Sequence, residues 1–333
     1  MKKRIIGILA GFFALLFMAG CTPQASSSLA SLAAEEDKVK VVTTIFPPYD
    51  FIRQIGGQHV EVSMLLAPGA ESHSFEPSPK DIITIQESDI FIYAGGENDT
   101  WVERILGSMD RSGKQDIAMI DLVEAVPEEV VEGMEEEYHE HEEGEEEHAE
   151  EAEQEEAAEL DEHVWTSPQN AITITRGLCS ALIQADEANS GDYTQKTEEY
   201  VQRLQKLDEN FTQAIGNASK KTIVVGDRFP FRYLADAYGL TYYAAFVGCS
   251  TETQASVGTI AFLIDKVEQE NIPVVFYIEF SSQKIADSIC ETTGAKKALL
   301  HSCHNVSKED FNNGTGYIEL MEENLKALKE ALY

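Results

Sequence analysis

Four of the eight histidines lie in or beside a run of carboxylates, a combination that could bind a divalent transition metal. His139, His141 and His148 are embedded among glutamates, and His163 follows directly in the sequence DEHVWTSPQN. Imidazole nitrogen favours zinc, copper, iron and nickel over calcium or magnesium. The same composition also describes an acidic tract that only keeps the protein in solution, with incidental histidines. The run by itself does not distinguish these two interpretations.

The acidic run carries twenty Asp or Glu residues and no Lys or Arg between Glu128 and Glu162, so it supplies 20 of the 34 net negative charges of the chain. A segment of this composition cannot bury enough apolar surface to fold, and we expect a solvated, disordered loop over residues 128–160. The strong acidity of the whole chain argues against nucleic-acid binding and suits a protein that handles cations.

The first 37 residues have the pattern of an export and anchoring segment. Basic residues at 2–4 precede an apolar run that is too short to span a bilayer, which is typical of a signal peptide over residues 1–20. The small residues before Cys21 resemble the lipobox of bacterial lipoproteins, in which that cysteine is acylated. An ordinary secretory signal with a chance cysteine is the alternative. Residues 21–37 indicate a flexible tether, so we expect a protein anchored by lipid to the outer face of the cytoplasmic membrane.

Apolar runs without strict alternation follow one another between helical patterns on both sides of the acidic run. Strands are predicted at residues 38–46, 59–66, 89–95, 221–227, 240–246 and 272–280. Helices are predicted at residues 47–57, 80–88, 228–239 and 259–271. This order is typical of parallel sheets covered by helices on both faces, and it predicts two α/β lobes.

A long amphipathic pattern lies between the two halves. Apolar residues recur at helical spacing from Tyr193 to Ile215, and Asn217 ends the pattern. It could be an ordinary surface helix, but its central position predicts a helical connection that resists wide hinge motion. The expected organisation is an N-terminal lobe over residues 38–190, a linking helix over 191–217 and a C-terminal lobe over 218–333.

Several segments, taken in order, resemble the metal-binding lipoproteins of bacterial zinc/manganese ABC importers. They are the lipobox, IFPPYDFIRQIGG, GAESHSFEPSPKDI, the acidic His-containing loop, DEHVWTSPQNA and YIELMEENLKALKEAL. The resemblance implies a two-lobed receptor that captures a divalent metal in the interlobe cleft and delivers it to a permease and its ATPase. We expect a monomer that contacts the membrane only through its lipid. Because the His-containing loop occurs in zinc-type members of that family, the expected ion is Zn²⁺, with Mn²⁺ less favoured.

The resemblance places the first two metal ligands on His73 and His163. At the third position the family has a histidine just after the first strand of the second lobe, whereas this chain reads VVGDRFPFRY. Counting from the strand puts Asp227 in that position, and counting back from Tyr233 puts Arg228 there. We favour Asp227, which could equally cap the helix that follows, and we expect Arg228 to pair with an acid.

The last family position falls in the loop LLHSCHNVS. His304 is the preferred ligand, His301 comes next, and Cys303 could ligate as a thiolate or form a disulfide with Cys249. A third imidazole with a carboxylate or water would complete a four-coordinate zinc site. The carboxylates expected to orient the ligating imidazoles are Glu71, Glu76 and Glu279.

The sequence contains no motif that indicates catalysis, and its cysteines do not define a disulfide pattern. The chain has no nucleophile elbow, P-loop or HExxH motif, so we expect no enzyme; a zinc metallohydrolase and a surface adhesin of the same fold are the alternatives. Four cysteines follow Cys21, and an even number permits one or two disulfides without defining their connectivity: Cys179, Cys249, Cys290 and Cys303.

We expect the acidic loop to concentrate cations without supplying the tight site. Deleting residues 132–158 should leave one tight zinc site, remove additional weak zinc binding and slow metal capture at low salt, because a solvated segment loses chain entropy when it closes on an ion. Equilibrium dialysis and stopped-flow capture measure these effects. The kinetic difference should shrink near physiological ionic strength, where the Debye length is roughly 8 Å. Loss of the tight site in a folded deletion variant would contradict this separation.

Overall fold

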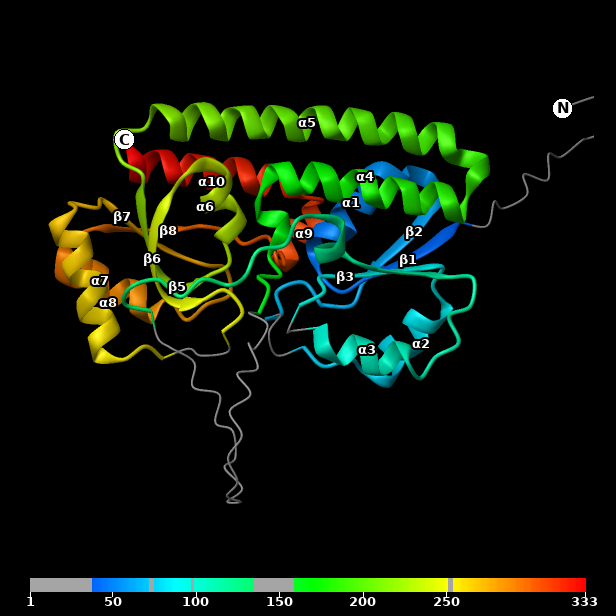
Figure 1. Ribbon diagram of the computed structural model, residues 1–333, viewed down its shortest axis with the longest axis horizontal. Helices are drawn as coiled ribbons and strands as arrows, with labels where there is room; N and C mark the ends of the chain where they lie inside the picture. Colours follow the sequence, from blue (N-terminus) through cyan, green and yellow to red (C-terminus); the bar gives the residue numbers. More distant parts are fainter. Residues whose placement is uncertain (1–37, 72–74, 97–98, 135–158, 251–253) are drawn as a thin grey trace, which may run out of the picture. The chain divides into compact units, whose positions relative to one another are not determined.

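The computed structural model describes residues 38–71, 75–96, 99–134, 159–250 and 254–333, which include both lobes (Figure 1). Within these ranges, no helix combines the length and apolar character needed to cross a bilayer. Several predicted features lie outside the described residues: the signal peptide, the tether, Cys21, His73, His139, His141 and His148.

The first lobe is built on a parallel four-stranded sheet of order β2-β1-β3-β4. Its strands are β1 (Val39–Thr43), β2 (Val60–Met64), β3 (Ile90–Tyr93) and β4 (Gln115–Ala118). Its helices are α1 (Phe46–Gly56), α2 (Pro79–Glu87) and α3 (Thr100–Leu106). Successive strand residues point to opposite faces, so Val41 packs in the core beneath α1 while Val42 packs with the apolar side chains of α2 and α3. Helices therefore cover both faces of the sheet, as predicted.

The second lobe repeats this arrangement with the sheet order β6-β5-β7-β8. Its strands are β5 (Thr222–Phe229), β6 (Thr241–Val247), β7 (Val274–Tyr277) and β8 (Lys296–Leu299). Its helices are α6 (Arg232–Tyr238), α7 (Val257–Gln269), α8 (Lys284–Thr293), α9 (Lys308–Asn313) and α10 (Tyr317–Leu332). Val224 faces a small core formed with α7 and α8, whereas Val225 faces the large core that includes α10.

The two sheets share a topology that favours a site at one edge. In each lobe the chain passes from the first strand to one neighbour and then crosses to the other side, so the order reverses between β1 and β3 and between β5 and β7. Ligands of open α/β sheets bind beyond the carboxyl ends of the strands near such a reversal. A ligand site is therefore expected at the carboxyl edges of the two sheets, near the loops that follow β1, β3, β5 and β7 and their neighbours.

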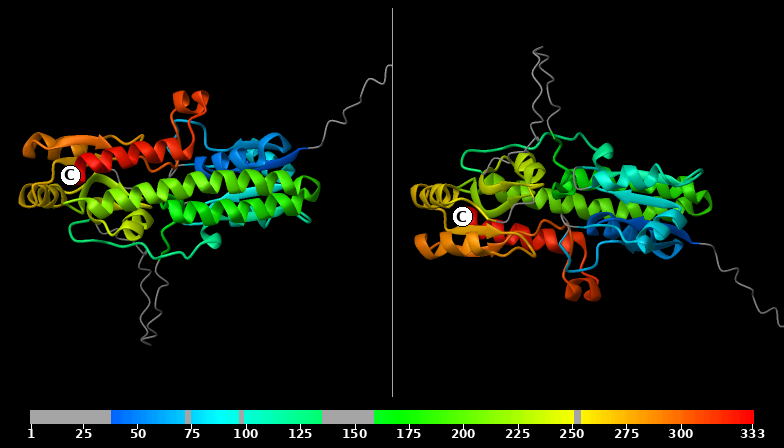
Figure 2. Two further views of the ribbon diagram at one scale, coloured as in Figure 1. Left: turned by 90° about the horizontal axis from the view of Figure 1, so that it is seen from above. Right: turned by 90° about the horizontal axis from the view of Figure 1, so that it is seen from below.

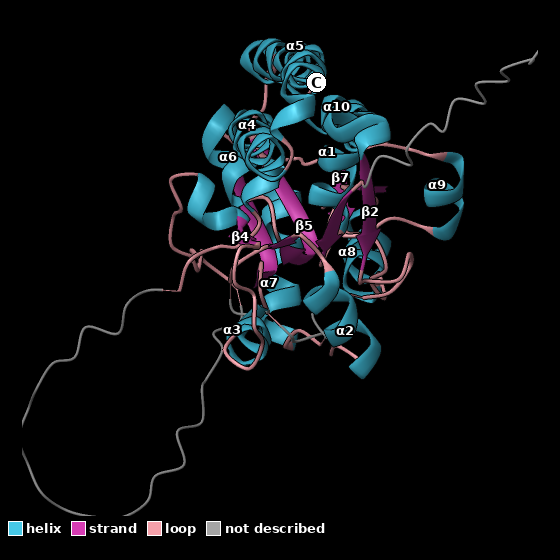
Figure 3. Cartoon of the chain, turned by 90° about the vertical axis from the view of Figure 1, so that its right-hand side faces the viewer, coloured by secondary structure: helices cyan, strands magenta, loops and turns pink. Residues whose placement is uncertain are grey.

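Two long helices connect the lobes, α4 (Pro168–Ala185) and α5 (Ser190–Asn217). Figures 1 and 2 show α5 extending past both sheets, and it packs against α1 of the first lobe and α10 of the second. Its apolar stripe is buried along most of its length, from Tyr193 to Ile215. Viewed end-on in Figure 3, α4, α5 and α10 lie on one side of the strands, and α2, α3 and α7 lie on the other. The predicted two-lobed α/β fold with a long linking helix is confirmed.

A fully buried carboxylate on α1 ties three helices together. Asp50 Oδ2 accepts the backbone N–H of Tyr317 at the start of α10 (2.8 Å) and the hydroxyl of Tyr200 on α5 (3.4 Å). Its other oxygen accepts from the guanidinium of Arg53 at 2.6 Å and from the amide of Gln54 at 3.1 Å. Burial and the nearby Asp50 carboxylate raise the pKa of Tyr200 well above its ordinary value, so its hydroxyl remains a donor. The pair of lobes is thereby locked to α5 by hydrogen bonds as well as by packing.

Both ends of the expected acidic loop belong to the folded protein. On one side Glu129 pairs with Arg232, Glu132 pairs with Lys266 at 3.2 Å, and Met134 is buried. On the other side Leu160 forms an isolated antiparallel bridge with Pro127. The bounds of the expected solvated segment are therefore corrected: residues 128–134 and 159–160 contact the second lobe or each other. A deletion that spares these contacts removes residues 135–158 instead of 132–158.

The four described cysteines are free thiols. Cys249 and Cys303, the pair considered for a disulfide, are both buried, and burial raises the pKa of each thiol well above its ordinary value. A protonated buried thiol behaves as a small apolar side chain, so these cysteines serve the packing of the second lobe.

Removing the carboxylate of Asp50 should weaken the whole fold. We expect Asp50→Ala to lower the free energy of unfolding by at least about 2 kcal/mol, because the Tyr317 amide and the Tyr200 hydroxyl each lose a buried acceptor worth about 1–3 kcal/mol. Urea unfolding followed by circular dichroism measures the change. The matched control is Glu322→Ala on the exposed face of α10, which should be near neutral. Equal stability of the two variants would contradict the assigned role of Asp50.

Candidate metal site

A small cavity lies where loops of the two lobes meet. The first lobe supplies Ala70 and Glu71, which follow β2. The second lobe supplies residues at the ends of three strands, with His163 added from the segment before α4: Arg228, Pro230, Ile278, Glu279, Phe280, Ser302, His304 and Asn305. The lining segments follow the carboxyl ends of parallel strands, where the topology predicts a ligand site.

His163 is the most deeply buried imidazole of the cavity, with no exposed surface. Its Nδ1 lies 3.0 Å from Asp161 Oδ1, and the same oxygen accepts the backbone N–H of His163 at 2.8 Å. A carboxylate that accepts Nδ1–H fixes the ring and the tautomer, so that Nε2 carries the lone pair that can bind a metal. Tyr233 on α6 supports this turn, since its hydroxyl donates to the backbone oxygen of Asp161 at 2.7 Å.

The electrostatic environment of His163 favours a cation. Burial alone would lower the pKa of this imidazole, but the carboxylates of Asp161, Glu162 and Glu128 outweigh burial and raise the pKa above its ordinary value of 6.5. These groups create a negative potential that stabilises a proton on the ring and would equally stabilise a metal ion beside it. A proton and a metal therefore compete for the same nitrogen, and lower pH should favour the proton.

A second imidazole, that of His304, lies against His163. The two ring centroids are 5.4 Å apart, and Trp165 packs against both, at 5.4 Å from His163 and 5.0 Å from His304. Trp165 is itself held in place, because its indole N–H donates to the backbone oxygen of Ser302 at 2.8 Å and its own carbonyl accepts the Tyr317 hydroxyl at 2.6 Å. The buried indole thus forms a rigid wall that fixes the relative position of the two imidazoles.

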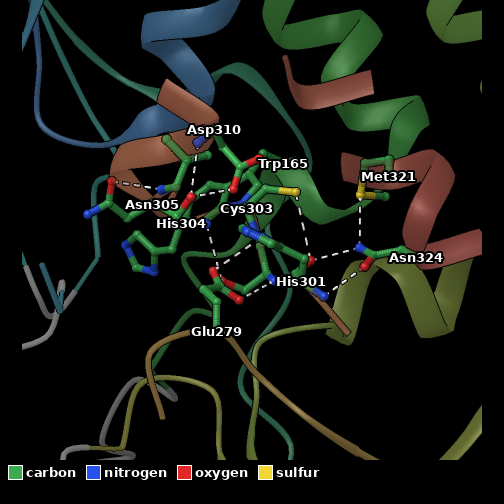
Figure 4. A network of polar contacts seen from close by, with 12 residues as sticks. Trp165, Glu279, His301, Cys303, His304, Asn305, Asp310, Met321 and Asn324 are labelled. Atoms are coloured by element: carbon green, nitrogen blue, oxygen red, sulfur yellow. Dashed lines mark hydrogen bonds and ion pairs between the residues drawn. The ribbon is translucent and has the colours of Figure 1, made fainter. Parts of the chain in front are cut away.

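The loop after β8 places His304 through an unusual backbone conformation. Cys303 has φ of +62°, in the left-handed region that β-carbon-bearing residues rarely adopt, and its amide donates to His301 Nδ1 at 2.9 Å. This turn buries the Cys303 side chain and directs His304 to the cavity. Figure 4 shows the resulting network, in which the side-chain amide of Asn324 on α10 accepts the backbone N–H of His301 and donates to its carbonyl. A strained residue held by several hydrogen bonds is typical of functional loops.

Asn305 extends the same loop across to the first lobe. Its side-chain amide donates to the backbone oxygens of Ala67 and Ala70, both at 2.8 Å. Ala70 immediately precedes Glu71, so this contact positions the first-lobe side of the cavity. Asn305 and Trp165 were not predicted as site residues, although both lie in the quoted segments, because their partners are backbone carbonyls far away in the chain.

His301 is placed differently from His304. Its ring is mostly buried, its Nδ1 accepts the Cys303 amide and lies 3.5 Å from a carboxylate oxygen of Glu279, and it is not among the residues that line the cavity. Of the two histidines considered for this loop, the structure brings His304 rather than His301 beside His163.

A β-bulge in β5 determines which of Asp227 and Arg228 lines the cavity. The pairing of β5 with β6 shifts register between Val225 and Arg228. Val225 pairs with Ala244 and Arg228 pairs with Phe246, so β5 contains one more residue than β6 over this stretch. The two ways of counting differ by one residue, and the bulge places this additional residue within the strand. A one-residue shift exchanges the two faces of a strand. Arg228 consequently lines the cavity, whereas Asp227 accepts the Arg228 amide at 2.9 Å and is not a lining residue. Neither residue caps the next helix, which begins after Phe231.

The expected partner of Arg228 is present. A terminal guanidinium nitrogen of Arg228 lies 3.2 Å from Glu71 Oε1 of the first lobe, and the other donates to the backbone oxygen of Ser250 at 3.2 Å. Glu279 also lines the cavity, whereas Glu76, the third carboxylate suggested for orienting imidazoles, is exposed. Within the described ranges, no group of three or more His, Cys, Asp or Glu side chains is arranged to hold a metal.

A larger hollow, lined mainly by first-lobe residues together with Cys249, lies near the ends of the acidic run. It is lined by carboxylates without an imidazole among its described lining residues, and burial raises the pKa of one of them, Asp99, to about 6. Carboxylates alone do not favour zinc-type ions over calcium or magnesium. The cavity that contains His163 and His304 is therefore the better candidate for a transition metal.

Comparison with known proteins identifies the family. The model of the periplasmic component A of zinc-uptake complexes, ZnuA, matches residues 41–331. The chain belongs to the ZnuA family. It is 33% identical over 335 residues to the high-affinity zinc uptake system protein ZnuA of Bacillus subtilis, with 100% of this chain and 99% of that protein covered. The family predicted from the sequence is thereby confirmed.

A further relative is a streptococcal zinc-binding lipoprotein whose ZnuA-like domain has a solved structure. The chain is 32% identical over 337 residues to the zinc-binding lipoprotein AdcA of Streptococcus pneumoniae; this covers 99% of the chain but only 61% of AdcA. The crystal structure of the Zn(II)-bound ZnuA-like domain of that AdcA has a TM-score of 0.71 and 28% identity, with 89% of this chain and 99% of the domain covered.

The pairing of Asp161 with His163 can be tested directly. Asp161→Asn should lower the pKa of the His163 imidazole, because the variant keeps the side-chain shape but removes the charge that opposes the effect of burial. The titration of the ring nitrogens by two-dimensional NMR in the metal-free protein gives this pKa. A control is Asp110→Asn, since that exposed carboxylate accepts only from the nearby Ser112 in an outer loop. An unchanged or higher His163 pKa in Asp161→Asn would contradict the proposed electrostatics.

Proposed function

We propose that this protein is the extracytoplasmic zinc receptor of an ABC importer, which captures Zn²⁺ between its lobes and delivers it to the permease and its ATPase. The observation that carries the proposal is the pair of cavity-lining imidazoles, His163 and His304, held 5.4 Å apart by Trp165 in a ZnuA-family fold. Imidazole donors suit zinc better than they suit manganese, which prefers carboxylates.

The proposed ligands are His73, His163 and His304, with water as the fourth. Three protein ligands and water give the four-coordinate geometry that zinc prefers. His73 follows β2 two residues after Glu71, which lines the cavity, and this sequence position supports its assignment. Asp227 and His301 fall outside the proposed set, because neither residue lines the cavity.

A zinc ion with an open position could in principle activate water, so the metallohydrolase alternative has to be weighed. Membership of an uptake-complex family supports transport. We therefore propose a receptor that is not an enzyme. It would act as a monomer, with acylation of Cys21 as its only attachment to the membrane.

The acidic run would serve as an accessory collector of ions. Its N-terminal end is bound to the second lobe through Glu129 and Glu132, and its other end pairs with Pro127 through Leu160, which keeps a high density of carboxylates near the folded protein. His139, His141 and His148 would provide weak zinc sites there, and the negative potential would raise the local concentration of cations.

Substitution of the cavity imidazoles tests the proposed function. We expect His163→Ala or His304→Ala to weaken zinc binding by at least about tenfold, or about 1.4 kcal/mol, since each removes one metal–nitrogen bond. Competition titration against a zinc chelator measures the affinity, and metal analysis of protein purified without chelator identifies the native ion.

Three variants serve as comparisons. His59→Ala removes a buried histidine that lies 2.9 Å from Asp192 of α5, outside the cavity, and zinc affinity should persist. His301→Ala and Asp227→Asn should have smaller effects than His304→Ala. Tight zinc binding by the His163→Ala/His304→Ala double variant would refute the site, and preferential binding of manganese by the unmodified protein would refute the assignment of zinc.

A further inference from the structure

Arg228 brings a permanent positive charge into a cavity that is otherwise suited to cations. Its side chain is only 9% exposed, and it lines the same cavity as His163 and His304. A guanidinium stays protonated under all physiological conditions and has no lone pair to offer a metal. Arg228 therefore cannot be a ligand, and its effect on the ion must pass through the groups that it binds.

The principal group bound by Arg228 is the carboxylate of Glu71 on the opposite lobe. The contact of 3.2 Å joins the end of β5 to the loop after β2, and the second arm of the guanidinium is anchored on the Ser250 carbonyl. With one arm fixed to the backbone, the guanidinium holds Glu71 in a defined place. A carboxylate bound in this way loses affinity for a second cation, because its charge is already compensated.

The other carboxylate of the cavity is engaged as well. Glu279 accepts both the backbone N–H and the hydroxyl of Ser302, and it lies 3.5 Å from His301. Both carboxylates among the described lining residues are thus bound to protein donors. Manganese, magnesium and calcium depend on carboxylate oxygen, whereas zinc binds well to imidazole.

We propose that Arg228 is a selectivity-determining residue, which holds the Glu71 carboxylate away from the bound ion and so disfavours oxygen-preferring cations relative to zinc. The inference rests on the proposed function, since it concerns the same cavity. The β5 bulge is what makes it feasible, because without the register shift the strand would present its other face to the cavity.

Release of Glu71 should change the ratio of two affinities. In Arg228→Met the apolar stem is retained but the charge is removed, so Glu71 becomes available to an ion. We expect the ratio of the dissociation constants for Mn²⁺ and Zn²⁺ to fall by at least about tenfold. In Arg228→Met/Glu71→Gln the freed carboxylate is absent, and the ratio should return to within about threefold of the unmodified protein. Isothermal titration with each metal, with chelator competition where binding is tight, supplies both constants.

Two further variants test whether a change in the affinity ratio comes from the contact between Arg228 and Glu71, and not from a disturbed fold or from the loss of any positive charge. Arg228→Lys keeps a cation within reach of Glu71 and should preserve the ratio, whether or not Arg228→Met folds well. Arg203→Met removes a surface arginine that pairs with Glu319 at 3.0 Å and serves as a matched control with an unchanged ratio. Circular dichroism verifies that each variant is folded.

The outcomes are distinct. A lower ratio in Arg228→Met that is reversed by Glu71→Gln supports the proposal. An equal gain in affinity for both metals, or a lower ratio that persists in the double variant, would show that Arg228 acts by general repulsion and would overturn it. A large change in the ratio of folded Arg228→Lys would overturn it too. Failure of the unmodified protein to bind zinc tightly would refute the proposed function itself, whereas tight zinc binding with an unchanged ratio in Arg228→Met would refute only this inference.

Discussion

The packing of α1, α5 and α10 around the buried carboxylate of Asp50 is the constraint on which the cavity depends. The cavity is formed by loops of two lobes, so its geometry is only as well defined as the relative position of the lobes. A single hinge would leave that position adjustable. A 28-residue helix that packs on both lobes, with a buried acid joining three helices, fixes it over the whole length of the interface. Differences between metals must therefore be sensed by side chains and loops at the cavity.

The carboxylates near the cavity fall into two sets with different effects on a bound cation. Asp161 and Glu162 are buried behind His163 and make its position favourable for a positive charge, whereas the carboxylates that line the cavity are each bound by a protein donor. Charge behind the ligand attracts any cation, and nitrogen at the surface of the cavity then favours the metals that prefer imidazole. Different groups therefore attract cations to the cavity and discriminate between metals.

The β5 bulge shows how a small irregularity changes the chemistry of a site. One additional residue in a strand exchanges the faces that its side chains occupy, so the choice between Asp227 and Arg228 is a choice between a potential ligand and a cation. The same logic applies at Cys303, where one left-handed residue separates a histidine bound within its own loop from a histidine that lines the cavity. In both places the backbone conformation selects which of two nearby residues lines the cavity.

The sequence alone determined the two α/β lobes, the long helix and the family, because apolar periodicity and local motifs depend on near neighbours in the chain. Edge strands β4 and β8 escaped prediction, since their short sequences QDIA and KKAL carry polar residues that suit a sheet edge. The sequence also gave His163 and His304 as candidates, but only the tertiary structure placed their rings together, oriented His163 with Asp161, and put Arg228 rather than Asp227 in the cavity. These outcomes depend on strand register and on contacts between residues far apart in the chain, such as Arg228 with Glu71 and Asn305 with Ala67, and no local pattern of residue types encodes such contacts.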